Sequence, residues 1–274
     1  MTFSTLMVHL NVDPSGDAWL TAALDLAQHF DAKVIGVAAA TLPWSFYGQE
    51  VTPRQIDELN EIISQRLADA EQRFRRAAMQ QHLQRIDWRS EIASPAAYLS
   101  LQARAADLII LGRNLDGLVP DSFQGHVDPG DLVMQVGRPV LVIPPQVGKI
   151  NLKCAMIAWK DTREARRAVS DALPLLRKVQ EVVVVEVIEE ESDRSAAHGR
   201  LDDVVSWLAG HGIPSVARVF DFPGNKDPMA KLYQYGADFI VAGGYGHAQA
   251  REWVFGGFTR DLLKRSPQCV FLSH

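Results

Sequence analysis

The chain alternates short apolar runs with longer segments in which apolar residues recur at helical spacing. The short runs predict buried strands, and the helical spacing predicts amphipathic helices. Strands are expected at residues 5–11, 33–39, 87–92, 107–112 and 140–143, and again at 153–159, 181–188, 214–220, 237–243 and 269–272. Helices are expected at residues 17–30, 53–80, 96–105 and 129–136, and again at 163–177, 197–210, 227–235 and 257–265.

This alternation of strands and helices is typical of a parallel sheet that is covered by helices on both faces. Val182-Val183-Val184-Val185 is the unbroken β-branched run that a strand buried on both faces requires. We therefore predict an α/β fold made of two tandem, Rossmann-like, open parallel sheets, each with five strands.

An internal repeat supports the division into two parts. The segment from Ala106 to Gly112 (ADLIILG) returns as Ala237 to Gly243 (ADFIVAG), and each copy precedes a loop, a helix and a final apolar strand. At roughly 100–200 residues per domain, the length also favours two domains. Pro144 to Asn151, with two prolines and a glycine, is the expected linker. We predict domains at residues 1–147 and 148–274.

The composition of the chain excludes several classes of protein. The net charge of −5 and the sequence pI of about 5.9 argue against a general nucleic-acid binder. Cys154 and Cys269 lack metal-ligand spacing and lie in apolar runs, so we expect buried, reduced thiols. The sequence contains no signal-peptide pattern and no apolar run long enough for a membrane span. We expect a cytoplasmic protein with no membrane or nucleic-acid partner.

A glycine-rich segment carries the clearest candidate chemistry. Gly243-Gly244-Tyr245-Gly246 follows a predicted strand, and Gly256-Gly257 precedes a predicted helix. In such a turn, backbone N–H groups can converge on a phosphate, and glycine lets the anion approach the backbone. The segment is neither a P-loop nor the dinucleotide fingerprint. Glycines also serve plain turns, so a purely structural loop is the alternative.

The spacing Gly-x2-Gly-x9-Gly, followed by a helix and a short closing strand, resembles the ATP loop of universal stress proteins. Residues 237–274 resemble the C-terminal end of a bacterial tandem member of that family. The resemblance implies an adenine-nucleotide alpha-hydrolase-like fold that binds ATP, with Mg²⁺ as a possible companion ion. The family usually has Ser or Thr after the third motif glycine, whereas this chain has Gly257, with Thr259 two places later.

The resemblance implies a nucleotide site that is made by two segments of the C-terminal half. Its residues are Gly243, Gly246, His247, Gly256, Gly257, Thr259, Lys160 and Asp161. Lys160 stands where the family often has Asp at the end of the first strand, and it cannot accept a hydrogen bond as Asp would. The alternative for this segment is a simple helix start in which Thr162 is the N-cap.

The corresponding loop of the first half departs further from the motif. Leu115 replaces the second glycine, although Gly125 keeps the spacing of the third. Four acidic residues would repel a phosphate there, namely Asp116, Asp121, Asp128 and Asp131. We expect no ATP binding through this loop. Asn11 or Asp13 could take the family's acidic position, and the alignment does not decide between them.

No group of residues in the sequence has the pattern of a catalytic or metal-binding constellation. The leading hypothesis is a stress-response regulator that binds ATP or a related nucleotide in its C-terminal half. The alternative is an interaction module that needs no nucleotide and in which the glycine loops are structural. Slow ATP hydrolysis is a third hypothesis. By the same resemblance, the last strands of the two halves should pair with each other, and a homodimer is expected.

Overall fold

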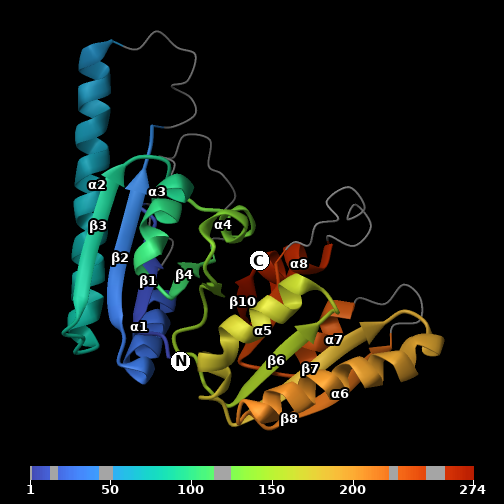
Figure 1. Cartoon of the computed structure of the whole chain (residues 1–274). Helices are drawn as coiled ribbons and strands as arrows, with labels where there is room; N and C mark the ends of the chain where they lie inside the picture. The colour runs from blue at the N-terminus through green and yellow to red at the C-terminus, as the bar shows by residue number, and fades with distance from the viewer. Residues whose placement is uncertain (1, 13–17, 43–51, 114–124, 222–227, 245–256) are drawn as a thin grey trace. The chain divides into compact units, whose positions relative to one another are not determined.

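The computed structural model describes residues 2–12, 18–42, 52–113, 125–221, 228–244 and 257–274. These residues form two compact units. The N-terminal unit contains Phe3–Arg138 and Ile143–Lys149, and the C-terminal unit contains Pro139–Val142 and Ile150–His274. The predicted α/β class is confirmed, because both units are built from parallel strands and intervening helices (Figure 1).

Four parallel strands form the sheet of the N-terminal unit, in the order β3-β2-β1-β4. They are β1 (Thr5–His9), β2 (Lys33–Ala40), β3 (Ile86–Ile92) and β4 (Leu108–Gly112). The helices are α1 (Ala18–Phe30), α2 (Pro53–Gln80), α3 (Pro95–Gln102) and α4 (Pro129–Val136). Helix α1 packs beside α2, and α3 packs beside α4, as expected when helices cover both faces of a sheet.

The long helix α2 docks on its own sheet along one stripe. A capping box starts the helix, since the Gln55 N–H donates to the Thr52 hydroxyl and the Thr52 N–H donates to the Gln55 side chain. Its buried residues recur at helical spacing, from Ile63 through Phe74 to Ala78. Phe74 lies against Trp88 of β3 with ring centroids 5.6 Å apart, so the second half of α2 covers the outer strands.

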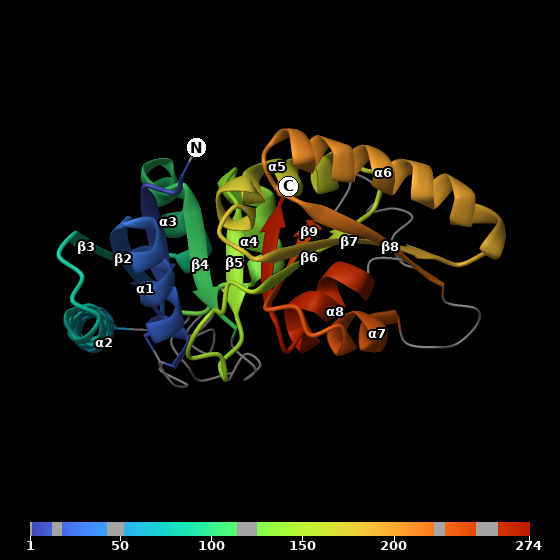
Figure 2. The same cartoon turned by 90° about the horizontal axis from the view of Figure 1, so that it is seen from below.

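The C-terminal unit has five parallel strands and one antiparallel strand, in the order β5-β10-β9-β6-β7-β8. The strands are β5 (Val140–Ile143), β6 (Cys154–Trp159), β7 (Glu181–Ile188), β8 (Ser215–Asp221), β9 (Phe239–Gly243) and β10 (Cys269–Ser273). The helices are α5 (Arg163–Leu176), α6 (Arg194–Gly210), α7 (Pro228–Gln234) and α8 (Gly257–Arg265). Helices α5 and α6 cover one face of this sheet, and α7 and α8 cover the other (Figure 2).

Strand β5 pairs with β10 in the antiparallel direction. Leu141 lies opposite Phe271 in an antiparallel register, and both side chains are fully buried. The final strands of the two sequence halves therefore pair with each other, as the family resemblance implied. The periodicity of residues 140–143 predicted the strand but contained no information on its direction.

Each unit contains the same hydrogen-bond motif at the start of its sheet. The Asp107 carboxylate accepts from the backbone N–H of Ser4 at 2.7 Å and of Thr5 at 3.0 Å. The Asp238 carboxylate accepts from the N–H of Lys153 and of Cys154, both at 2.9 Å. Because Asp107 and Asp238 are equivalent in the repeat, this shared geometry agrees with an internal duplication.

Among the described residues, no helix has both the length and the apolar character needed to span a bilayer.

Candidate functional site

The strand order of the C-terminal unit reverses between β6 and β9. Strand β6 pairs with β7 on one side and with β9 on the other, all in parallel. In an open parallel sheet, ligands bind outside the carboxyl ends of the strands at such a reversal. Trp159 ends β6 and Gly243 ends β9, and Ala158 and Ala242, just before them, are register partners. Both predicted segments of the site therefore reach the same point on the sheet edge.

Gly243 has a packing role of its own. A Cβ atom on this residue would lie 2.6 Å from the backbone nitrogen of Ala165 and 2.8 Å from the carbonyl carbon of Glu164. The end of β9 thus approaches the first turn of α5 more closely than a larger residue permits. The next amide, that of Gly244, donates to the Ser273 carbonyl at 2.8 Å and continues the pairing with β10.

Helix α8 brings the second half of the glycine motif to the sheet edge. Because α8 joins the parallel strands β9 and β10, its N-terminus lies at the carboxyl end of the sheet. Gly257 is its first residue, is exposed, and has open space where a Cβ would be. Thr259 follows in the same turn, whose N–H groups lack partners within the helix. Three predicted site residues, Gly246, His247 and Gly256, lie outside the described residues.

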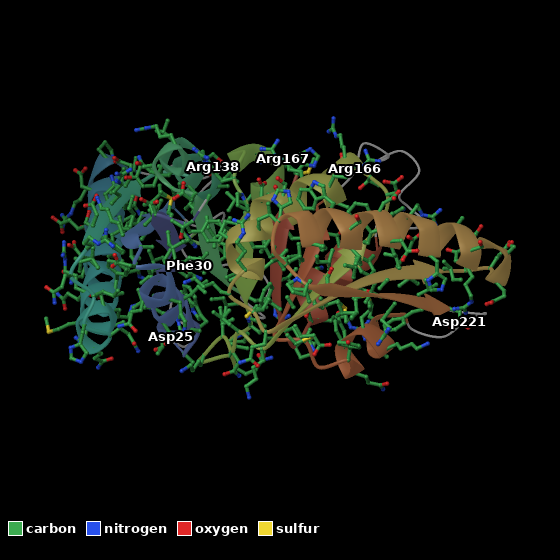
Figure 3. The ribbon with its side chains drawn as sticks, turned by 60° about the horizontal axis from the view of Figure 1, so that its bottom comes forward. Asp25, Phe30, Arg138, Arg166, Arg167 and Asp221 are labelled. Carbon is green, nitrogen blue, oxygen red and sulfur yellow. The ribbon has the colours of Figure 1, made fainter. Side chains whose placement is uncertain are left out.

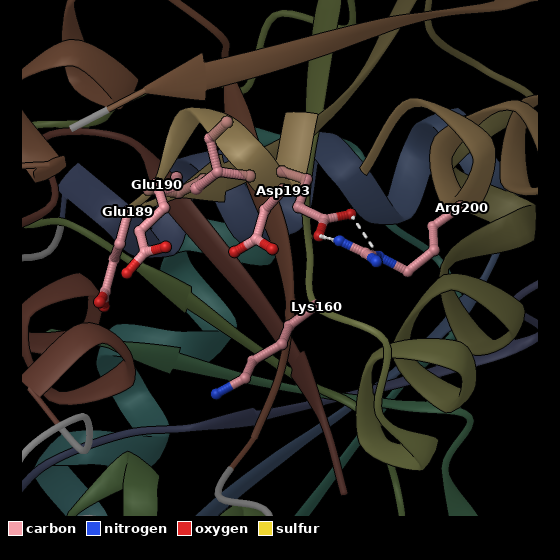
Figure 4. A pocket seen from close by; sticks show the side chains of 8 residues that line it. Lys160, Glu189, Glu190, Asp193 and Arg200 are labelled. Carbon is pink, nitrogen blue, oxygen red and sulfur yellow. Dashed lines mark hydrogen bonds and ion pairs between the residues drawn. The ribbon is translucent and has the colours of Figure 1, made fainter. Parts of the chain in front are cut away.

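Lys160 lines a pocket of about 330 Å³ beyond the ends of β6 and β7 (Figure 4). The facing side is acidic, because Glu189, Glu190 and Asp193 also line the pocket. A sugar hydroxyl can donate to such carboxylates, but a polyphosphate would be repelled by them. The acidic run from Glu189 to Asp193 is exposed and forms one wall of this pocket.

Asp161 is turned to a different cavity from Lys160. Its carboxylate accepts from the Arg166 guanidinium at 2.6 Å, and both side chains line a groove beside α5. Figure 3 marks Arg166 on this helix. The structure therefore does not place the two predicted residues in one pocket. The N-cap alternative for the next residue is confirmed, since the Thr162 hydroxyl accepts from the Ala165 N–H at 3.3 Å.

The arginine that divides the two cavities was missed by the sequence analysis. Arg200 of α6 lines both of them, and its Nε donates to the two carboxylate oxygens of Glu186 at 3.0 and 3.2 Å. Hydrogen bonding to Glu186 raises the pKa of Arg200, so the guanidinium stays charged. Glu186 lies in β7 and Arg200 lies 14 positions later, and no local sequence pattern connects them.

The matching edge of the N-terminal unit is only partly described. Asp13, Leu115, Asp116 and Asp121 lie outside the described residues. Asp128 is the N-cap of α4, where it accepts from the N–H groups of Gly130 and Asp131, and Asp131 stands in the first turn. These two acids therefore satisfy a helix N-terminus. The Asn11 carbonyl accepts from Arg73 of α2 at 2.7 Å.

Within the described ranges, no three His, Cys, Asp or Glu side chains are grouped so that they could hold a metal ion.

Comparison with solved structures identifies the same fold in universal stress proteins. One from Archaeoglobus fulgidus matches over 98% of this chain and 95% of its own, with a TM-score of 0.69 and 15% identity. A functionally unknown protein from Pseudomonas aeruginosa matches over 99% and 92%, with a TM-score of 0.59 and 11% identity. The tandem architecture is thus shared along nearly the whole chain. At these identities the likeness establishes the fold alone.

A universal stress protein in complex with cAMP matches 52% of this chain and 98% of its own, with 17% identity and a TM-score of only 0.37. No family model matches the sequence, and no curated protein matches it.

Proposed function

We propose that this chain is a tandem universal stress protein whose C-terminal unit binds ATP or a related adenine nucleotide, and that it acts as a stress-response regulator. One observation carries the proposal. Gly243, the first glycine of the motif, and Gly257, which follows the third, lie at the carboxyl edge of the sheet at the reversal of strand order, beside the end of β6. A phosphate-binding turn in this fold is expected at that point.

The charges suggest how a nucleotide would lie. The Lys160 pocket has four carboxylates and two cationic side chains among its lining residues, so it disfavours a polyphosphate tail. The exposed N-terminus of α8 carries N–H donors and the positive end of a helix dipole. We therefore place the phosphates, with any Mg²⁺, on the side of Gly257 and Thr259. The nucleoside then lies on the Lys160 side, where carboxylates can accept from the ribose hydroxyls.

Gly257→Val is the informative variant for testing this proposal. A Cβ at Gly257 meets no atom of the described residues within 4 Å, so the substitution leaves their packing intact while its branched side chain obstructs the approach of a phosphate. Isothermal titration of the full chain with ATP and Mg²⁺ should show saturable binding that weakens at least tenfold, about 1.4 kcal/mol, in the variant. Gly210→Val is the matched control, because Gly210 also has open space and ends α6, far along the chain from the motif.

Two results would count against the proposal. The first is a wild-type chain that takes up no ATP and releases no small molecule on denaturation. The second is equal weakening of ATP binding by Gly257→Val and by Gly210→Val. A phosphate-release assay on the same samples separates binding from slow hydrolysis, since true turnover must also fall in the Gly257 variant.

A nucleotide-independent interaction module remains the second candidate, and the Gly243 contact is the observation that favours it. Close packing on Ala165 and Glu164 explains this glycine without any ligand. If the module hypothesis holds, millimolar ATP will leave the melting temperature unchanged, because a ligand that binds only the native state must raise it.

A further inference from the structure

A second cavity of the C-terminal unit lies along the facing sides of α5 and α6 and encloses about 410 Å³. This volume is in the range of sites for small organic ligands. Its apolar lining consists of two indole rings, Trp159 and Trp207, with the branched side chains of Val169 and Val204. We refer to it as the indole groove. Of its lining residues, only Arg200 also lines the Lys160 pocket, so the two cavities are distinct.

Trp159 provides an unused hydrogen-bond donor at this groove. The residue ends β6 and is only 8% exposed, and its indole Nε1 is buried and has no hydrogen-bond partner among the described residues. Buried polar groups are nearly always bonded, and an unpaired one destabilises the folded state. Because Nε1 is closed to solvent, an acceptor on a bound molecule would bond to it only after the ring turns its N–H toward the groove.

Trp207 provides an accessible aromatic wall. It is 42% exposed, and one part of its ring system contacts His211, with centroids 4.2 Å apart. Large aromatic side chains in concave, accessible positions are the usual anchors for planar ligands. Because Trp207 lies on α6 and Trp159 lies on β6, the two rings come from separate elements and line one space.

The charges at the groove select against an ionic ligand. The Arg166 guanidinium is bonded to Asp161, and the Arg200 guanidinium is bonded to Glu186. Asp203 adds a further carboxylate to the lining. The cations are therefore compensated, and an anionic ring would meet two carboxylates. A neutral molecule avoids both the repulsion and the cost of desolvating a charge.

We propose that the indole groove binds a small, neutral, planar aromatic molecule that carries a hydrogen-bond acceptor. The ring lies against Trp159 and Trp207, and the acceptor takes the Trp159 N–H. This site is separate from the proposed nucleotide site and does not depend on it.

Isoquinoline and naphthalene form a matched pair of probes, because they share size and shape but only isoquinoline has an acceptor nitrogen. In two-dimensional proton–nitrogen spectra of the full chain, the six tryptophans give six indole N–H signals. Isoquinoline should shift the Trp159 signal downfield, and that signal is identified by its loss in Trp159→Phe. Isoquinoline should bind about three- to tenfold more tightly than naphthalene, the ratio expected for one net hydrogen bond.

Trp159→Phe should equalise the two affinities, since it removes the donor but keeps an aromatic ring. Trp88→Phe is the matched control. Like Trp159, Trp88 has a buried indole N–H with no partner among the described residues, but it lies in β3 of the N-terminal unit. Its substitution should therefore leave the binding of both probes unchanged. Val204→Phe, which fills the groove, should abolish binding of both probes while the Trp159 signal remains as a marker of correct folding.

Three results would overturn the proposal. The first is the absence of saturable binding by either probe to the wild-type chain. The second is equal affinity of the two probes in the wild-type chain, or an advantage of isoquinoline that survives in Trp159→Phe. The third is competitive displacement of isoquinoline by ATP, which would make the groove part of the nucleotide site.

Discussion

At the scale of single residues, His9 of β1 shows how burial sets a charge state. Its side chain is almost fully enclosed, with only 6% of the residue exposed. Burial, assisted by the nearby His126, lowers the pKa of His9 to about 3. The imidazole is therefore neutral throughout the physiological range, and protonation would require placing a charge in the core of the N-terminal unit.

His9 should make the stability of the chain depend on pH. Its folded-state pKa lies below the ordinary value of about 6.5, so between these values the unfolded state binds a proton that the folded state does not. Above that window His9 does not affect stability, and within it stability falls by up to about 1.4 kcal/mol for each pH unit of acidification. Urea unfolding at pH 7 and at about pH 5.5 should show a loss that is about 1 kcal/mol smaller in His9→Gln.

The exposed His198 of α6 is the control for this experiment. His198→Gln should retain the pH dependence of the wild-type chain. If His9→Gln and the wild-type chain lose the same stability on acidification, His9 is not the group responsible.

Residue roles were predictable from the sequence only where they depend on nearby residues. Thr162 could be identified as an N-cap because the amide that it accepts from is three positions away. The pairing of Glu186 in β7 with Arg200 in α6, and the burial of the Trp159 N–H at the end of β6, depend on how separate elements pack. Such features arise from tertiary structure, so no local pattern in the sequence could indicate them.

At the scale of elements, most strands and helices follow from the periodicity of apolar residues. Strand β7 occupies residues 181–188 and helix α2 occupies residues 53–80, as predicted. What the periodicity could not provide is the contact between elements. The glycines that end β4 and β9 illustrate this, since Gly112 leaves room for the Trp19 ring and Gly243 leaves room for the backbone of α5.

Gly243→Ala should destabilise the chain whether or not a nucleotide binds. The added methyl group would meet main-chain atoms of Ala165 and Glu164, which cannot rotate away, so α5 must move off β9. Overpacking of this kind typically costs about 1–3 kcal/mol, measurable as a lower midpoint in urea unfolding. Gly257→Ala is the contrasting change, because its methyl group enters open space and should leave stability nearly unchanged.

Equal stability of Gly243→Ala and the wild-type chain would show that α5 and β9 can separate at little cost. If the predicted loss is found, weaker ATP binding by any Gly243 variant becomes ambiguous. Gly257 is therefore the better position at which to test the nucleotide site.

At the scale of the whole molecule, the internal repeat predicted two similar units because both halves keep the same order of apolar runs. The repeat did not predict that β5 belongs by packing to the C-terminal unit. Residues 140–143 have the same apolar pattern whether they extend one sheet or border another. The domain boundary between residues 147 and 148 therefore stays a prediction, since β5 precedes that position in sequence and pairs with β10, which follows it.

The position of β5 leads to a prediction about fragments of the chain. A fragment of residues 148–274 lacks β5 and so exposes the hydrogen-bonding edge of β10, whose residues Cys269–Ser273 are buried in the full chain. Unpaired apolar edges recruit other strands, so this fragment should dimerise through antiparallel pairing of its own β10 strands. A fragment of residues 139–274 retains Val140–Val142 as the covering strand, so it should not dimerise through β10 over the same concentration range.

Sedimentation velocity of the two fragments across a range of concentrations checks this expectation directly. Leu141→Pro in the longer fragment is the matched variant, because proline removes a ladder donor and disfavours the strand without shortening the chain. It should restore the dimerisation through β10 that is expected of the shorter fragment. If the shorter fragment remains monomeric and folded, the edge of β10 needs no partner, and the pairing with β5 would contribute little to the assembly of the C-terminal unit.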